Sequence, residues 1–164
     1  KSELTEAPGL VLGQSEVNLL EITGSYGVFA NQGTWYRPHG IKRILDGNDC
    51  ADPQNLKTCR VIYRFDGQQP GNQAKISPKM AKTMTTLLKG VIEKGTARIA
   101  RLGLGEAGKT GTTDRAIDLW FIGYVPRQGL VTGVWLGNDD NSPTRGSSSQ
   151  AAALWAAYTR KITP

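Results

Sequence analysis

Apolar residues recur every three or four positions in three segments of the chain, and this spacing predicts three amphipathic helices. The first helix is expected to follow Ser15 as its N-cap and to end at 31–33, Asn-Gln-Gly. The second is expected to start at Ser77 and Pro78, which suit the N-cap and the first helical position. The third covers residues 150–162, near the end of the sequence.

Between the second and third of these segments, the apolar positions become nearly continuous. Two runs, 119–125 and 130–137, are joined by Pro126 and 127–129, a connection short enough for an antiparallel hairpin. Because both runs are apolar at successive positions, the sheet should be covered on both faces. With a further strand near 108–113, the pattern predicts three strands within 108–137. The expected fold class is therefore α+β, an antiparallel sheet flanked by helices.

Residues 35–66 are expected to form a hairpin excursion from this sheet. Two arms, 41–46 and 60–66, flank a stretch of turn-forming residues. Cys50 and Cys59 lie at the two ends of that turn, where a disulfide would close the loop and lower the entropy of the unfolded chain. We expect this disulfide, and with it an oxidising compartment. The alternative is a pair of free thiols on a mobile loop.

Composition narrows the function classes. Hydrophobic residues make up 38% of the chain, which excludes disorder, and no apolar run approaches the ~20 residues of a membrane span. The 20 Lys and Arg against 14 Asp and Glu give a net charge of +6, but the basic residues are scattered, which favours a solvated basic surface over a nucleic-acid site. The start, Lys1-Ser2-Glu3-Leu4, has no signal-peptide pattern, so a cytosolic chain or a piece of a larger protein is expected.

The potential metal ligands are few. Two cysteines and one histidine are too few for a zinc site of usual composition. His39 has no nearby serine or carboxylate in the sequence and is expected to be a surface loop residue. We expect no metal and no cofactor.

The sharpest motif lies at residues 103–114. Gly103 to Thr110 matches the phosphate-loop pattern, Gly, any four residues, then Gly-Lys-Thr. That interpretation needs a strand before the loop and a helix after it, so that the helix N-terminus faces the phosphates. Here a helical segment comes first, and Gly111, two threonines and an apolar strand follow. A phosphate-loop NTPase is therefore kept only as an alternative.

The same residues fit better an edge strand that lines a cleft. Lys109 would project a cation, while Thr110 and Thr112, two positions apart, would offer hydroxyls on one face. Gly111 between them permits close approach of another chain. Such a strand can bind an extended, peptide-like ligand by backbone pairing and hold its carboxylate by charge and hydroxyls. This arrangement suits an acyl-transfer site.

Residues 107–113, Ala-Gly-Lys-Thr-Gly-Thr-Thr, resemble the K-T-G strand of penicillin-binding proteins and serine β-lactamases. Further runs resemble the transpeptidase domain of bifunctional class A penicillin-binding proteins: 12–17, 29–33, 38–41, 88–91, 95–97, 119–126 and 130–140. The resemblance covers about residues 9 to 162. It identifies 1–164 as the C-terminal portion of one transpeptidase domain, with a partial penicillin-binding or β-lactamase-like fold.

The resemblance implies that the parent protein is a serine-type D-Ala-D-Ala transpeptidase fused to a glycosyltransferase. Such an enzyme cross-links peptidoglycan by acyl transfer from stem peptides, and β-lactams mimic its substrate. The resemblance assigns catalysis to Lys109, which assists proton transfer, and to Thr112, whose N–H is an oxyanion donor. Substrate binding falls to Thr110, Gly111, Thr112 and Thr113.

Two motifs of the family, S-x-x-K with the nucleophile and S-x-N, occur nowhere in the sequence. The isolated chain is therefore expected to be inactive, and its expected partners are the upstream part of the same domain, stem peptides and β-lactams, without nucleic acid. The implied location is extracytoplasmic, on the periplasmic side of the bacterial inner membrane, with the parent anchored by an N-terminal segment outside this sequence. The alternative is a non-catalytic binding or scaffolding fragment of the same fold.

Overall fold

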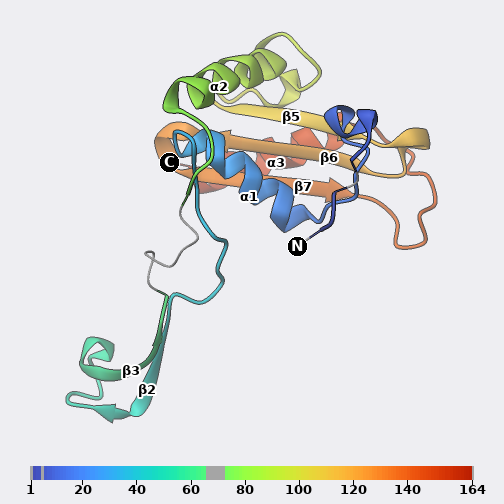
Figure 1. The fold of residues 1–164 in the computed structure, drawn as a ribbon. Helices are drawn as coiled ribbons and strands as arrows, with labels where there is room; N and C mark the ends of the chain where they lie inside the picture. Colours follow the sequence, from blue (N-terminus) through green and yellow to red (C-terminus); the bar gives the residue numbers. More distant parts are fainter. Residues whose placement is uncertain (1, 5, 66–72, 164) are drawn as a thin grey trace.

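The computed structural model describes residues 2–4, 6–65 and 73–163. Its centre is an antiparallel sheet in the order β5 (Ala107–Thr112), β6 (Leu119–Val125), β7 (Leu130–Leu136). As Figure 1 shows, α1 (Leu19–Ala30) crosses one face and α3 (Ser148–Ile162) the other, while α2 (Pro78–Glu93) packs along β5. The expected α+β fold, an antiparallel sheet flanked by helices, is confirmed. Among the described helices, none is both long and apolar enough to cross a membrane.

The middle strand β6 contributes to the core on both faces, because successive side chains of a strand point in opposite directions. Phe121 and Val125 pack against Trp155 of α3, and the Phe121 and Trp155 ring centroids lie 5.3 Å apart. Tyr124 points to the opposite face, where it packs against Leu88 of α2 and the partly buried side chains of α1. The continuous apolar run of β6 is the consequence of this double role.

The helix starts follow the capping residues, with one difference from the sequence prediction. Ser77 caps α2 as expected, and its hydroxyl accepts a hydrogen bond from the Met80 N–H over 3.2 Å. The prediction that Ser15 caps α1 is wrong, because Asn18 takes that place and its side chain accepts from the Glu21 N–H over 2.9 Å. Asn is as good an N-cap as Ser. Asn18 also lies immediately before the first residue with helical geometry, whereas Ser15 lies three residues earlier.

The hairpin excursion projects away from the sheet as a two-stranded arm of β2 (Arg43–Cys50) and β3 (Cys59–Arg64), as Figure 1 shows. At its root, β1 (Thr34–Trp35) pairs with β4 (Gln73–Ala74). The first arm runs to residue 50 rather than 46, because the ladder is irregular after Asp46 and resumes where Cys50 lies opposite Cys59. Residue 66, the expected end of the second arm, lies outside the described residues.

The expected disulfide is present and joins Cys50 to Cys59 at the far end of the arm. Arg60 adds two ion pairs across the two strands, with Asp46 at 2.5 Å and Asp49 at 2.7 Å. These links matter because a two-stranded hairpin is marginally stable on its own in water. His39 is exposed, as expected, and its ring stacks on Phe65 with the centroids 3.7 Å apart.

Candidate functional site

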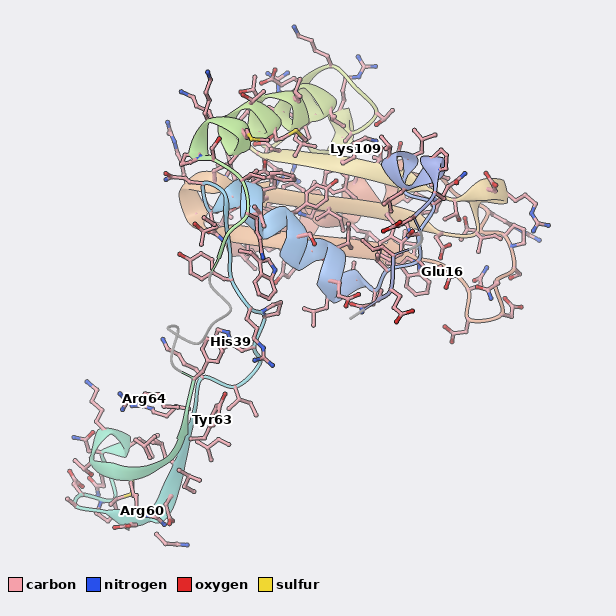
Figure 2. All side chains as sticks on the ribbon, in the orientation of Figure 1. Glu16, His39, Arg60, Tyr63, Arg64 and Lys109 are labelled. Carbon is pink, nitrogen blue, oxygen red and sulfur yellow. A yellow bond between two sulfur atoms is a disulfide. The ribbon has the colours of Figure 1, made fainter. Side chains whose placement is uncertain are left out.

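Strand β5 carries the K-T-G motif and lies at the edge of the sheet, next to β6. Thr110 is the register partner of Phe121, which faces α3, so the side chains of Thr110 and Thr112 point to the α3 face. Lys109 points to the opposite face, and Figure 2 shows it on β5. The two hydroxyls therefore share one face and the cation occupies the other.

The backbone of β5 offers hydrogen-bonding groups along its outer edge. In an antiparallel pair, residues alternate between those whose N–H and C=O face the partner strand and those whose groups face away. The Thr113 N–H donates to the Asp118 carbonyl over 3.1 Å, so the backbone N–H and C=O of Thr113 face the β6 side. Thr112 and Thr110, one and three residues earlier, therefore direct their N–H and C=O groups outward. In the parts of the chain that the structure describes, no strand pairs with that edge.

The Lys109 ammonium lies at this same edge. Its Nζ donates to the carbonyl oxygen of Thr110 over 2.9 Å. No carboxylate within residues 2–4, 6–65 and 73–163 forms an ion pair with Lys109. An uncompensated positive charge therefore lies beside the outward N–H of Thr112, and an anionic group in extended conformation could contact both.

The Thr110 hydroxyl forms a hydrogen bond within the protein. Its Oγ1 lies 2.7 Å from Oγ1 of Thr96, and either atom can be the donor. Thr110 is only 9% exposed, whereas Thr96, in the segment after α2, is exposed. Sequence reasoning placed Thr96 only within the run 95–97 that resembles the family and gave it no role. The contact joins residues fourteen positions apart, so local pattern could not reveal it.

The hydroxyl of Thr113 is engaged in the turn between β5 and β6. It donates to Oδ2 of Asp118 over 3.0 Å and accepts from the Asp118 N–H over 2.8 Å. The other carboxylate oxygen of Asp118 accepts from Nε1 of Trp135 on β7, also over 2.8 Å. The side chain of Thr113 thus closes the turn, and no donor proton of its hydroxyl remains for a ligand.

A buried carboxylate fixes the loop that leads into β5. Glu106 is 5% exposed and accepts hydrogen bonds from the N–H groups of Leu102, Leu104 and Gly103 at 2.5, 2.8 and 3.2 Å. Burial alone would raise the pKa of this carboxyl, but these bonds and one from its own N–H outweigh burial and lower the pKa below its usual value.

The same bonds exclude the phosphate-loop interpretation. In such a loop the backbone N–H groups cradle phosphates and a helix follows. Here the N–H groups of 102–104 bind Glu106, and strand β5 follows in place of a helix. The phosphate-loop alternative is therefore wrong.

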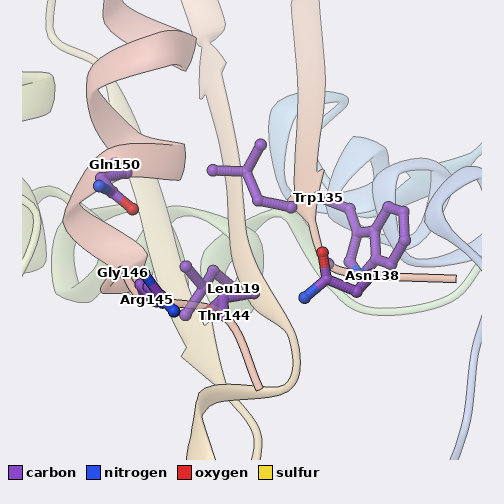
Figure 3. Close-up of a pocket in the computed structure, with 9 residues that line it drawn as sticks. Leu119, Trp135, Asn138, Thr144, Arg145, Gly146 and Gln150 are labelled. Atoms are coloured by element: carbon purple, nitrogen blue, oxygen red, sulfur yellow. The ribbon is translucent and has the colours of Figure 1, made fainter. Parts of the chain in front are cut away.

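An open cavity of about 420 Å³ lies between the end of β7, the loop that follows it and the first turn of α3 (Figure 3). Its connection to β5 is Leu119, the register partner of Thr112. Thr144 fixes the loop above it, donating from N–H and hydroxyl to the Ala116 carbonyl at 2.9 and 2.6 Å. Arg145 contributes a cation. The lining is Leu119, Trp135, Leu136, Gly137, Asn138, Thr144, Arg145, Gly146 and Gln150. No local pattern in the sequence could predict this cavity, because its walls come from four separate segments.

The family comparison matches residues 5–159 to "Penicillin binding protein transpeptidase domain". Among curated proteins, penicillin-binding protein 1A of Aquifex aeolicus (strain VF5) is 36% identical over 158 residues. The match covers 94% of this chain and 20% of that relative. The chain therefore spans about one fifth of the length of this curated relative.

Solved structures share the fold. Penicillin-binding protein 1A from Haemophilus influenzae aligns with a TM-score of 0.72 at 21% identity, over 98% of this chain and 28% of that one. The D,D-transpeptidase domain of a peptidoglycan glycosyltransferase from Eggerthella lenta aligns with a TM-score of 0.64 at 22% identity, over 99% and 37%. The expectation of a partial penicillin-binding fold is confirmed.

Proposed function

Because this chain belongs to the penicillin-binding protein transpeptidase family, we propose that it supplies the K-T-G strand of a serine-type D,D-transpeptidase. The complete enzyme cross-links peptidoglycan by acyl transfer from the D-Ala-D-Ala end of a stem peptide to an amine of a neighbouring strand. One observation carries the proposal: the outer edge of β5 combines the outward N–H of Thr112 with the Lys109 ammonium.

The ligand binds as an added strand. An extended D-Ala-D-Ala end pairs with the outward backbone groups of Thr110 and Thr112, as peptides do at open sheet edges. The hydroxyls of both threonines and the charge of Lys109 hold the terminal carboxylate. Gly111 has no side chain to obstruct this approach. Thr113 contributes by closing the turn after β5, through its two hydrogen bonds with Asp118.

Acylation needs a nucleophile that this sequence does not contain. A serine of the upstream part of the same domain attacks the carbonyl carbon of the penultimate D-Ala, and negative charge develops on the carbonyl oxygen. The peptide bond to the terminal D-Ala then breaks, and this residue leaves with a proton on its amine. The Thr112 N–H is one donor to that oxygen, and the N–H of the nucleophile is the second. Lys109 exchanges the neutral Thr110 carbonyl for anionic partners, which form stronger hydrogen bonds, and assists the proton transfer from the serine.

The parent is a bifunctional class A enzyme in this proposal, with a glycosyltransferase and an N-terminal membrane anchor outside the present sequence. It works on the periplasmic side of the inner membrane. The Cys50–Cys59 disulfide supports an extracytoplasmic location, because such bonds persist in oxidising compartments. The partners are stem peptides, β-lactams and the upstream part of the same domain.

Labelling with a fluorescent penicillin distinguishes this enzyme from a non-catalytic scaffold of the same fold. The complete protein should form a stoichiometric, heat-stable adduct, whereas the chain of 164 residues should form none, because a serine or threonine without an adjacent base is a poor nucleophile. Intact-mass analysis checks both. An unlabelled complete protein would favour the scaffold, and a labelled isolated chain would refute the assignment of the nucleophile to the upstream part.

A further inference from the structure

A pair of hydroxyls joins Thr110, a buried residue of β5, to Thr96 in the segment after α2. The two Oγ1 atoms are 2.7 Å apart, and Thr96 is exposed. The carbonyl of Thr110 is also engaged, by Nζ of Lys109 at 2.9 Å. Thr110 is therefore held at its side chain and at its backbone, whereas no other described residue bonds to the hydroxyl of Thr112.

Backbone hydrogen bonds and two buried alanines hold the segment around Thr96 in place. The backbone there is fixed by the Ala97 N–H, which donates to the Val91 carbonyl over 3.2 Å, and by the Ala100 N–H, which donates to the Ala97 carbonyl over 2.9 Å. The side chains of Ala97 and Ala100 are fully buried. An exposed hydroxyl can also find water in place of a protein partner. The pairing with Thr110 therefore calls for another explanation.

The number of protons on the two hydroxyls suggests an explanation for this pairing. Each hydroxyl has a single donor proton and can accept two hydrogen bonds. If Thr110 donates to Thr96, it has no proton left for a ligand, and a carboxylate can only accept. If Thr96 donates to Thr110, the proton of Thr110 is free to point at the carboxylate, and the two bonds in series strengthen each other.

We propose that Thr96 is a positioning residue of this transpeptidase: its hydroxyl donates to Thr110 and so directs the Thr110 proton to the carboxylate of the substrate or drug. The inference rests on the proposed function and extends it to a residue outside the K-T-G strand. The inference predicts that removing the Thr96 hydroxyl slows acylation only by ligands that carry the carboxylate.

The test measures acylation of the complete enzyme by benzylpenicillin and by its methyl ester, which lacks the negative charge. Thr96→Val should lower the rate constant with the acid by about tenfold relative to the ester. The bond affected is the one from the Thr110 hydroxyl to the charged carboxylate, and about tenfold is the low end of the loss expected for such a bond. Thr96→Ser keeps the hydroxyl and should restore the ratio of the two rate constants to that of the wild type.

Thr85→Val is the matched control. It also removes one of two paired hydroxyls, since Oγ1 of Thr85 lies 2.9 Å from the hydroxyl of Tyr124. That pair lies on the opposite face of the sheet from Thr110, because Tyr124 is the register partner of Ala107. The control should leave the acid-to-ester ratio unchanged, whatever it does to stability. Should Thr96→Val fail to fold, Thr96→Ala against Thr96→Ser gives the same comparison.

The outcomes separate the two proposals. A lowered ratio in Thr96→Val, restored by serine, supports the positioning role. If Thr96→Val lowers the acylation rate constant equally with acid and ester, or with neither, the positioning role is overturned. Acylation of the wild type would still support the proposed transpeptidase function. A wild-type enzyme that neither compound acylates overturns the proposed function, and the role of Thr96 with it.

Discussion

Gly123 of β6 lies in direct contact with the indole of Trp155, so closely that a Cβ at position 123 would be 2.6 Å from Cε2 of that ring. The same added Cβ would lie 2.7 Å from the ring of Phe121. Trp155 is fully buried, so it has no room to move aside. The absence of a side chain at position 123 is therefore what allows α3 to pack on the sheet.

Gly123→Ala should lower the free energy of unfolding by about 1–3 kcal/mol, the usual cost of an added methyl group in a packed core. Gly90→Ala is the matched control, because nothing lies within 4 Å of a Cβ at that position in α2. It should raise stability by about 0.5–1 kcal/mol through helix propensity. Urea unfolding of the three proteins checks both signs, and a neutral Gly123→Ala would contradict the packing described.

The Glu106 carboxylate predicts a dependence of stability on pH. Its pKa is lower in the folded protein than in the unfolded chain, mainly because four backbone N–H groups bind the charged form despite the opposing effect of burial. The stabilisation is therefore complete above the unfolded-state pKa, about 4.3, and is lost as the pH falls through the lower folded-state value.

Glu106→Gln should remove this dependence and cost about 1–3 kcal/mol near pH 7. The measurement is urea unfolding of both proteins from pH 7 to pH 3. The difference between them should shrink as the pH falls. Asp140→Asn is the comparison for an exposed carboxylate that also binds a backbone N–H, that of Ser142, and its effect should be smaller. A difference between wild type and Glu106→Gln that grows on acidification would contradict this account.

The disulfide should stabilise the projecting arm rather than the sheet. Replacing Cys50 and Cys59 with serine should speed amide hydrogen exchange within β2 and β3, because the arm has few other links, and leave exchange in β5, β6 and β7 unchanged. Alkylation of the denatured, unreduced wild type should add no mass. A gain of two alkyl groups would show two free thiols.

Much of the fold follows from local pattern. Ser77 and Pro78 specify the start of α2, and the apolar runs around Pro126 specify the antiparallel pair β6 and β7. The start of α1 could not be predicted as well, because Ser15 and Asn18 are both good N-caps and only the backbone geometry at Asn18 distinguishes them. The extension of β2 depends on an irregular register with β3, which alternation of side chains does not encode.

Part of the candidate site could likewise be predicted from the sequence, and part could not. The position of Lys109 on an edge strand, and the shared face of Thr110 and Thr112, follow from the sequence. The partner of Thr110 does not, because Thr96 reaches it only when the segment after α2 folds against β5. Thr113 could not be separated from its neighbours by sequence, since its engagement with Asp118 depends on the turn.

The central claim concerns Lys109, whose ammonium lies at the open edge of β5 without a carboxylate partner among the described residues. In the complete enzyme, Lys109→Ala should slow acylation by a β-lactam by about 10²–10⁴-fold, the range of a lost acid–base contribution. Lys109→Arg should recover only part, because a guanidinium stays charged and cannot share a proton as an ammonium can. Thr112→Val keeps the backbone N–H and should cost less, about 1–3 kcal/mol.

Stopped-flow acylation of the complete enzyme tests this most directly, with Lys82→Ala of α2 as the control for loss of an exposed cation. The account predicts that Lys109→Ala is the slowest variant, that Lys109→Arg and Thr112→Val are intermediate, and that Lys82→Ala keeps the wild-type rate. A Lys109→Ala enzyme that acylates at the wild-type rate, while Thr112→Val fails, would contradict it.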